Sequence, residues 1–328
     1  MRTLENLICP VHKTPLEHSS SSAVEEHYSC EMGCSFPVRG NVPRFVSEDN
    51  YASAFGWQWN RYAATQLDSC SGTTISRDRL TRCLGGDLSV VSGKTVLEAG
   101  CGSGRFSEIL LGSGALTFSC DLSIAVEANF TNFGDHPGHF VCQGDIRKLP
   151  VPAQSFDFVV CIGVVQHTPD PEETIRALAS YVKPGGMLII DHYTYGYDLA
   201  PPKKILRWFL LKFNPQAGSY TAVAISKFFV FFHRLLWRKS RIARMLRTWL
   251  MRISPLVDYY DAYPQLGNKL LSEWCVLDTH DTVTDFYKHL RSAEEICSAL
   301  EASKLEPVSV TYGGNGVEAR ATRHPNAT

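Results

Sequence analysis

The chain has 328 residues, which suffices for one domain of about 200 to 250 residues with a smaller module attached. Its composition, 44% hydrophobic and 20% charged residues, is typical of a globular protein and excludes a disordered or collagen-like chain. The formal net charge of −1 hides an asymmetry, because residues 199–257 carry twelve Lys or Arg and no Asp or Glu, which leaves −13 for the remaining residues.

The sequence predicts a cytoplasmic protein. It contains no run of the roughly 20 apolar residues that a membrane span needs, and its first residues lack the apolar core of a signal peptide. The eleven cysteines are odd in number and irregular in spacing, which favours reduced thiols over a disulfide framework.

Residues 1–46 are predicted to form a small metal-binding module. Three thiols and one imidazole have a spacing that suits a tetrahedral Zn²⁺ site: Cys9, His12, Cys30 and Cys34. His18 and His27 are competing candidate ligands, and a module without metal is the alternative. Because four protein ligands leave no position open for chemistry, a Zn²⁺ ion here would be structural.

Residues 47–93 are predicted to form a helical cap on the domain that follows, over residues 94–328. The segment 50–70 is rich in aromatic residues and has a helical pattern. The pair Ser92-Gly93 marks a break before the first strand of the larger domain.

From Lys94 onward, short apolar strands alternate with helices, an order typical of a parallel sheet. The apolar runs predict strands over residues 95–99, 115–120, 139–142, 156–162 and 187–192. Helices are expected over residues 103–111, 123–132, 171–182 and 292–302, and a helix stop and turn at 183–186. Two last strands, 308–311 and 317–321, are expected to pair antiparallel. The predicted fold is therefore α/β, with a doubly wound, seven-stranded and mostly parallel sheet.

A glycine-rich turn follows the first of these strands. Gly100 permits a tight turn, and Gly102 and Gly104 let the backbone approach a ligand that a side chain would push away. Dinucleotide-binding enzymes use a loop of the form G-x-G-x-x-G, but Arg105 stands here where their third glycine would be.

The glycine turn and the acid before it resemble the first motif of class I S-adenosyl-L-methionine (SAM) dependent methyltransferases. The residues that carry this resemblance are Glu98-Ala99-Gly100-Cys101-Gly102-Ser103-Gly104. The resemblance covers residues 94–193 and implies a Rossmann-like sheet with SAM as cofactor and methyl donor. It implies that Asp121 pairs with both ribose hydroxyls, since a carboxylate is a natural acceptor for a diol.

The same resemblance assigns further residues to the cofactor. It implies that Asp145 receives the adenine amino group and that Glu98 anchors, directly or through water, the end of SAM that bears the amino group. The complete predicted set is Glu98, Gly100, Cys101, Gly102, Gly104, Asp121, Leu122, Asp145, Ile146 and Cys161.

The amino-terminal module resembles the zinc-ribbon segment that precedes some bacterial methyltransferases, including its trailing residues 36–43. It departs from that pattern at two points. His12 stands where the ribbon usually has cysteine, and three residues instead of two separate Cys30 from Cys34.

Residues 199–272 are an insertion that the sheet does not need, and the family builds its acceptor pocket from insertions at this place. Projected as one helix, residues 234–253 gather an apolar face of Leu235, Ile242, Leu246, Trp249 and Ile253. The opposite face holds mostly arginines: Arg234, Arg238, Arg241, Arg244 and Arg252. Three interpretations stay open: a lid whose apolar face packs on the fold, peripheral contact with an anionic membrane, or contact with RNA phosphates.

The resemblance implies methyl transfer, for which a base is useful when the acceptor is an alcohol or phenol. His167, after the fourth strand, is the candidate general base, and His192 follows it. Other polar candidates are not ranked by any rule: His280, Asp281, Tyr287 and His289.

The aromatic and cationic insertion favours O- or C-methylation of a hydrophobic small molecule or lipid-linked precursor as the function. One alternative is an RNA base methyltransferase, although the sequence pI of about 6.8 is low for a nucleic-acid-binding protein. The other is a non-catalytic protein that binds SAM or interacts through its zinc ribbon.

Overall fold

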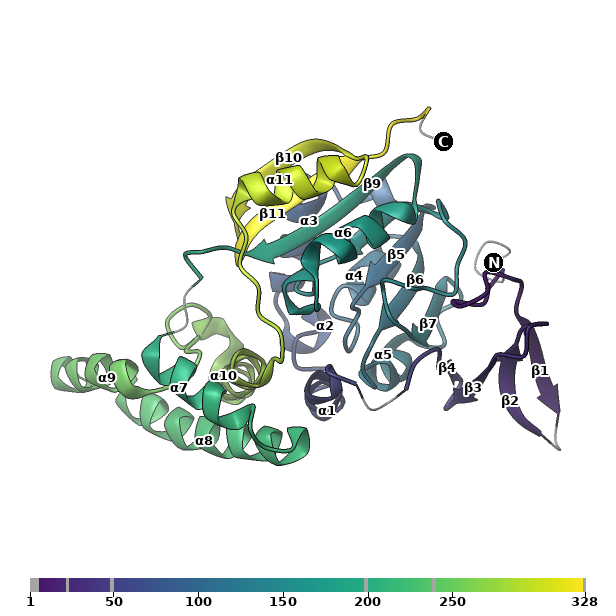
Figure 1. Cartoon of the computed structure of the whole chain (residues 1–328). Helices are drawn as coiled ribbons and strands as arrows, with labels where there is room; N and C mark the ends of the chain where they lie inside the picture. The colour runs from purple at the N-terminus through teal and green to yellow at the C-terminus, as the bar shows by residue number, and fades with distance from the viewer. Residues whose placement is uncertain (1–5, 22–23, 48–49, 198–199, 238–239, 327–328) are drawn as a thin grey trace.

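The computed structural model describes residues 6–21, 24–47, 50–197, 200–237 and 240–326. It contains two sheets and a group of helices beside the larger sheet (Figure 1). The smaller sheet is antiparallel, and its strands follow chain order: β1 (Glu17–Ser21), β2 (Val24–Ser29), β3 (Ser35–Arg39) and β4 (Val42–Pro43).

The larger sheet has seven strands in the order β10-β11-β9-β8-β5-β6-β7. Five strands are parallel: β5 (Thr95–Ala99), β6 (Leu116–Asp121), β7 (His139–Gln143), β8 (Phe156–Cys161) and β9 (Val182–Tyr193). The antiparallel pair β10 (Glu306–Gly313) and β11 (Gly316–Thr322) closes one edge. The predicted fold class is confirmed. The chain adds β6 and β7 on one side of β5 and then β8 and β9 on the other side. The order of strands thus changes direction at β5, and sheets of this kind bind ligands in a crevice at that point.

Helices cover both faces of the larger sheet because its strands are apolar on both sides. One face packs α3 (Ile75–Leu84) and α4 (Ser107–Gly112) against residues such as Val96 and Val160. The other packs α6 (Pro171–Ser180) and α11 (Ala293–Ala302) against residues such as Leu97 and Phe118. The short helix α5 (Val126–Phe133) packs beside the edge strand β7.

The smaller sheet is joined to that edge. The N–H of Phe45 donates to the carbonyl of Gln143 on β7 at 2.8 Å, and the N–H of Ile8 donates to the carbonyl of Pro150 at 2.9 Å. The Arg44 side chain is 4% exposed and pairs with Glu127 on α5 at 2.8 Å. The chain then enters the cap helices α1 (Ser53–Arg61) and α2 (Asp68–Ser71).

The insertion is helical: α7 (Pro201–Leu210), α8 (Pro215–Leu236), α9 (Arg241–Ile253) and α10 (Gly267–Thr284). Helix α10 packs on α1, α7 and α8, and α9 lies at the outer edge of the molecule (Figure 1). None of the helices that the structure describes is both long and apolar enough to cross a bilayer.

The structure corrects the prediction of a single helix over residues 234–253. Trp237 has an extended backbone, with ψ of 130°, and the Ser240 side chain accepts a hydrogen bond from the N–H of Ala243, which caps a new helix. Arg238 lies outside the described residues, as do residues 1–5 of the predicted module and the start of the predicted insertion.

The expected turn at residues 183–186 is also wrong, because the Lys-Pro-Gly-Gly run lies within β9. The pairing of β8 with β9 shifts register between Phe156 and Phe158, and this irregularity accommodates the run. The N–H of Gly185 donates to the carbonyl of Arg323 at 2.9 Å, so the backbone stays paired although proline lacks a donor.

Candidate functional site

A cavity of about 750 Å³ lies beyond the carboxyl ends of β5, β6 and β8. The cap contributes Tyr51, Phe55 and Trp59 to its walls, and α10 contributes polar and aromatic side chains. The predicted cofactor residues that line it are Gly100, Cys101, Gly102, Asp121, Leu122, Asp145 and Ile146. The tertiary structure therefore brings together predicted residues from the ends of β5, β6 and β7, which are distant in the sequence.

The glycine turn needs its glycines. Gly100 has a φ of 81° and Gly102 a φ of 51°, in the left-handed region where side chains are strained. A Cβ added at Gly100 would lie 2.3 Å from Cγ2 of Val164. The turn is thus fixed by both backbone conformation and close packing.

Asp121 ends β6 and faces this turn. Its Oδ2 accepts a hydrogen bond from the N–H of Gly102 at 2.9 Å, and its Oδ1 accepts from the N–H and the hydroxyl of Ser123 at 2.8 and 2.7 Å. Burial raises the pKa of Asp121, and these hydrogen bonds oppose the rise. The carboxylate is held at the cavity wall beside the turn, where it suits a ligand diol.

Asp145 follows β7, and its orientation is also fixed. Arg147 donates from Nη2 to Oδ2 of Asp145 at 2.7 Å, and the N–H of Arg147 donates to Oδ1 at 2.9 Å. The adjacent Ile146 is 6% exposed and supplies an apolar surface to the same part of the cavity. This pairing of an acid with an apolar neighbour suits a purine ring that carries an amino group.

Three predicted cofactor residues are not part of the cavity wall: Glu98, Gly104 and Cys161. Glu98 is 2% exposed and accepts hydrogen bonds from the hydroxyls of Ser107 and Ser119, the latter at 3.0 Å. Burial raises the pKa of Glu98 to about 7. In this structure Glu98 joins the end of β5 to α4 and β6, and its contact with a cofactor stays a prediction.

The cavity is also lined by aromatic residues outside the predicted cofactor set, among them Phe55, Tyr193, Tyr197, Tyr259, Tyr263 and Trp274. Such a lining suits an apolar or aromatic ligand.

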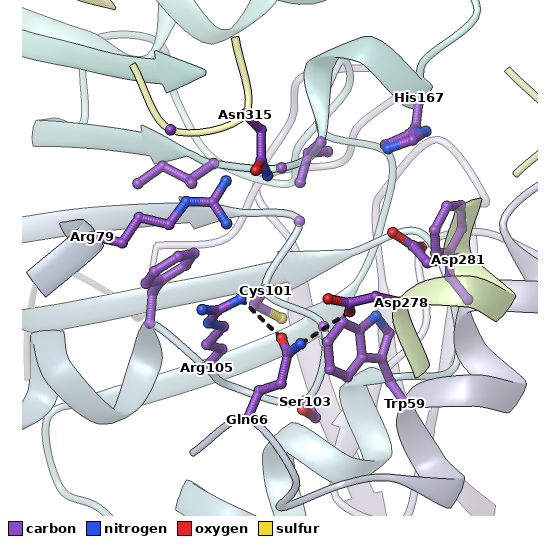
Figure 2. Close-up of a pocket in the computed structure, with 18 of the residues that line it drawn as sticks. Trp59, Gln66, Arg79, Cys101, Ser103, Arg105, His167, Asp278, Asp281 and Asn315 are labelled. Carbon is purple, nitrogen blue, oxygen red and sulfur yellow. Dashed lines mark hydrogen bonds between the residues drawn. The ribbon is translucent and has the colours of Figure 1, made fainter. Parts of the chain in front are cut away.

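Two carboxylates of α10, Asp278 and Asp281, line the cavity and are one helical turn apart (Figure 2). Asp278 is engaged, because it accepts hydrogen bonds from the Tyr259 hydroxyl at 2.5 Å and from Nε2 of Gln66 at 3.1 Å. The Asp281 carboxylate makes no hydrogen bond within the described part of the chain, and burial raises its pKa to about 7. The sequence did not predict Asp278 as a site residue, and it offered Asp281 only as one of several polar candidates without a rank. The i,i+3 spacing of two acids among apolar residues was the available signal.

His167 also lines the cavity, in a short helical turn after β8. Its Nδ1 lies 3.1 Å from the carbonyl oxygen of Tyr287 and 3.2 Å from Oδ2 of Asp285. Burial alone would lower the pKa of His167, but the Asp285 carboxylate beside it outweighs burial and raises the pKa. His192 and His280 lie elsewhere: Nδ1 of His192 is 2.8 Å from the carbonyl of Tyr193, and His280 pairs with Gln58.

The four predicted metal ligands lie together in the amino-terminal module. Nδ1 of His12 is 3.5 Å from Sγ of both Cys30 and Cys34 and 3.8 Å from Sγ of Cys9. All four donor atoms lie within 4.8 Å of one another. A tetrahedral Zn²⁺ ion holds sulfur and nitrogen ligands about 3.5 Å apart, so this donor set fits the ion. The competing candidate His18 pairs instead with Glu26 at 2.8 Å.

Residues 97–190 match a protein family described as "Methyltransferase domain". The matched stretch runs from β5 into β9 and includes the glycine turn, Asp121 and Asp145. It covers less than a third of the chain and places a methyltransferase domain over these residues.

Curated relatives match the same part of the chain. The "Ubiquinone biosynthesis O-methyltransferase" of Coxiella burnetii (strain Dugway 5J108-111) is 39% identical over 104 residues, which are 31% of this chain and 44% of the relative. The protein of the same name from Stutzerimonas stutzeri is 34% identical over 107 residues, covering 31% and 45% of the two chains. The chain therefore spans less than half the length of the curated relatives that it matches.

Solved structures are similar over more of the chain at lower identity. A magnesium protoporphyrin IX methyltransferase from Synechocystis PCC 6803, solved with bound SAH, is 15% identical with a TM-score of 0.44, over 83% of this chain and 96% of that one. A SAM-dependent methyltransferase from Aquifex aeolicus is 13% identical with a TM-score of 0.41, over 79% and 92% of the two chains.

Proposed function

Because residues 97–190 are a methyltransferase domain, we propose that the protein uses SAM to methylate a hydroxyl oxygen of a hydrophobic small molecule or lipid-linked precursor. One observation carries the proposal: the cavity that is lined by the glycine turn, Asp121 and Asp145 is also lined by many aromatic side chains. One cavity thus has room for a cofactor and an apolar acceptor. The names of the Coxiella and Stutzerimonas relatives favour oxygen over carbon as the acceptor atom.

The residues present fit SAM. Asp121 would bind the ribose hydroxyls, Asp145 and Ile146 would bind the adenine, and the turn at residues 100–102 would lie against the rest of the cofactor. When bound, SAM supplies a methyl group activated by a positively charged sulfur. The contribution of the chain is then to hold the acceptor oxygen in line and to exclude water, which accounts for much of the rate enhancement in such displacements.

We assign His167 the role of general base for the acceptor hydroxyl. Its Nδ1 is engaged by the Tyr287 carbonyl and Asp285, which fixes the ring and leaves Nε2 without a hydrogen-bond partner among the described residues. Figure 2 shows the ring at the cavity wall, on the same side of the view as Asp281. A neutral imidazole whose Nδ1–H donates to the Tyr287 carbonyl can accept a proton at Nε2.

Replacing His167 with glutamine is expected to lower kcat by about 10²- to 10⁴-fold, the usual contribution of a general base. Only neutral imidazole accepts a proton, and Asp285 raises the pKa of His167. The wild-type rate should therefore rise with pH through a midpoint above the ordinary histidine value, and His167→Gln should lose that rise. The measurement is kcat against pH at saturating SAM.

Asp281→Asn is the matched control for this experiment, because the pKa of Asp281 is raised to about 7 and it would titrate in the same range. If His167 is the base, Asp281→Asn keeps the rise with pH, with its midpoint moved to lower pH because the Asp281 charge helps to raise the pKa of His167. If Asp281→Asn loses the dependence and His167→Gln keeps it, the assignment of His167 is wrong.

The proposed function is tested with SAM labelled in its methyl group. The purified protein is incubated with the lipid, polar small-molecule and RNA fractions of a bacterial extract. Label should enter the lipid fraction and survive RNase. Label in RNA would support the RNA methyltransferase, and tight SAM binding with no labelled fraction would support the non-catalytic alternative.

A further inference from the structure

Many large apolar side chains of α7, α8 and α9 are exposed, and we call this set of exposed side chains the α7–α9 face. Its large side chains are strongly exposed, with 63% exposure at Trp208, 62% at Phe231, 68% at Ile242 and 64% at Trp249. The other exposed apolar members are Ile205, Phe209, Phe213, Phe228, Phe232, Leu235, Met245, Leu246 and Ile253. So many exposed aromatic and aliphatic side chains on one group of helices indicate an interaction surface.

Helix α9 carries the clearest sign of a partner. Its apolar residues recur every three or four positions, but this stripe points to solvent, while Ala243 and Arg247 face inward. Arg247 is buried because it pairs with Asp261 at 2.6 Å and with Asp258. The interpretation of this segment as a lid with its apolar face packed on the fold is therefore wrong for α9.

Helix α8 has the same organisation. Its inner side, with Val223 and Val230, packs in the helical core, while Phe228 and Phe231 are 59% and 62% exposed on the outer side. Both helices thus bury one side and leave a second apolar side uncovered.

Cations are interspersed with the apolar residues along the chain, and residues 199–257 contain no acid. The exposed cations that pair with no carboxylate among the described residues are Lys212, Lys227, Arg234, Arg241, Arg244 and Arg252. Two of them lie over exposed tryptophans: Lys212 is 3.4 Å from the ring centre of Trp208, and Arg252 is 5.4 Å from that of Trp249. The face thus combines positive charge with amphipathic aromatic rings.

We propose that the α7–α9 face binds the surface of an anionic lipid bilayer. Basic helices that expose Trp, Phe and Leu lie in the interface, with the apolar side chains inserted and the cations at the lipid phosphates. A second copy of the chain fits less well, since a two-fold interface would oppose the same cations. RNA would account for the cations but not for the uncovered apolar stripe.

The chain leads from the α7–α9 face directly into residues of the cavity wall. Directly after α9, residues of the chain from Val257 to Asp281 supply part of the cavity wall, including Tyr259 and Trp274. Binding at a bilayer would bring this wall close to apolar molecules dissolved in the lipid. Membrane binding itself does not depend on the proposed methylation, so an experiment can contradict either proposal and leave the other intact.

The test is co-sedimentation of the full chain with vesicles of phosphatidylcholine, with and without phosphatidylglycerol. We expect binding to the anionic vesicles, weakened by salt, and a blue shift of tryptophan fluorescence when Trp208 and Trp249 enter the interface. The triple variant Phe231→Ser, Ile242→Ser, Trp249→Ser should bind at least about tenfold more weakly. Replacing Arg241 and Arg244 with glutamate should remove the preference for anionic lipid.

Val308→Ser is the control, because Val308 is 56% exposed on β10, away from the α7–α9 face, and this variant should bind vesicles as the wild type does. Equal thermal stability of the variants would show that they fold. The proposal is overturned if the wild type binds no anionic vesicles, or if the triple variant binds them as tightly as Val308→Ser. It is also overturned if the variants abolish a dimer or RNA binding and leave vesicle binding unchanged.

Discussion

Asp121→Ala is expected to weaken SAM binding by about 100-fold or more, to the point where calorimetry detects no binding at micromolar protein. The carboxylate would accept two hydrogen bonds from the ribose, each contributing about 1.5 to 3 kcal/mol when one partner is charged. Losing both costs about 3 kcal/mol or more, which corresponds to a factor of at least about 100 in Kd. The variant also removes the acceptor for the N–H of Gly102, which loosens the turn.

Two further variants make this result specific. Asp121→Asn keeps the size of the side chain and one carbonyl oxygen, so its affinity should lie between those of the wild type and Asp121→Ala. Asp135→Ala removes an exposed acid, which does not line the cavity, and should leave Kd unchanged. If a folded Asp121→Ala protein bound SAM as tightly as the wild type, the assignment of the cofactor site would be wrong.

Removal of the metal should have the second large effect. We expect the purified protein to contain one Zn²⁺ per chain, and a strong chelator or Cys30→Ser to lower the melting temperature of the amino-terminal module. The four donors converge within 4.8 Å, and structural Zn²⁺ contributes about 10 to 16 kcal/mol to the folding of zinc-finger peptides at neutral pH. Without the ion, a module of only four short strands keeps little core.

The loss of stability on removal of the metal should extend beyond the amino-terminal module. Its last strand leads through Arg44 and Phe45, which are bound to the larger sheet, to the cap residues Tyr51 and Phe55 on the cavity wall. We therefore expect weaker SAM binding in the metal-free protein. Cys70→Ser is the control, because Cys70 is exposed and far from the metal ligands in the sequence. A metal analysis that finds no zinc, together with a melting curve unchanged by chelator, would contradict the prediction.

The sequence by itself determined the fold class, the glycine turn and the places of Asp121 and Asp145. These features are local: an apolar strand, a small-residue turn and an acid at the next strand end occur in a fixed order along the chain. Parallel pairing then brings the strand ends to one edge, so the order in the sequence becomes a site in space. The metal ligands could be selected for the same reason, since their spacing alone suited a tetrahedral ion.

Only the tertiary structure decided which side of an amphipathic helix is buried. Periodicity predicted two faces around α9, but the inward face holds Arg247, because Asp258 and Asp261 of the following segment neutralise it. Likewise, nothing local shows that Asp281 faces the cavity while Glu98 lies behind the turn. The physical reason is that burial and the pairing of charges depend on neighbours distant in the sequence, which a local pattern does not specify.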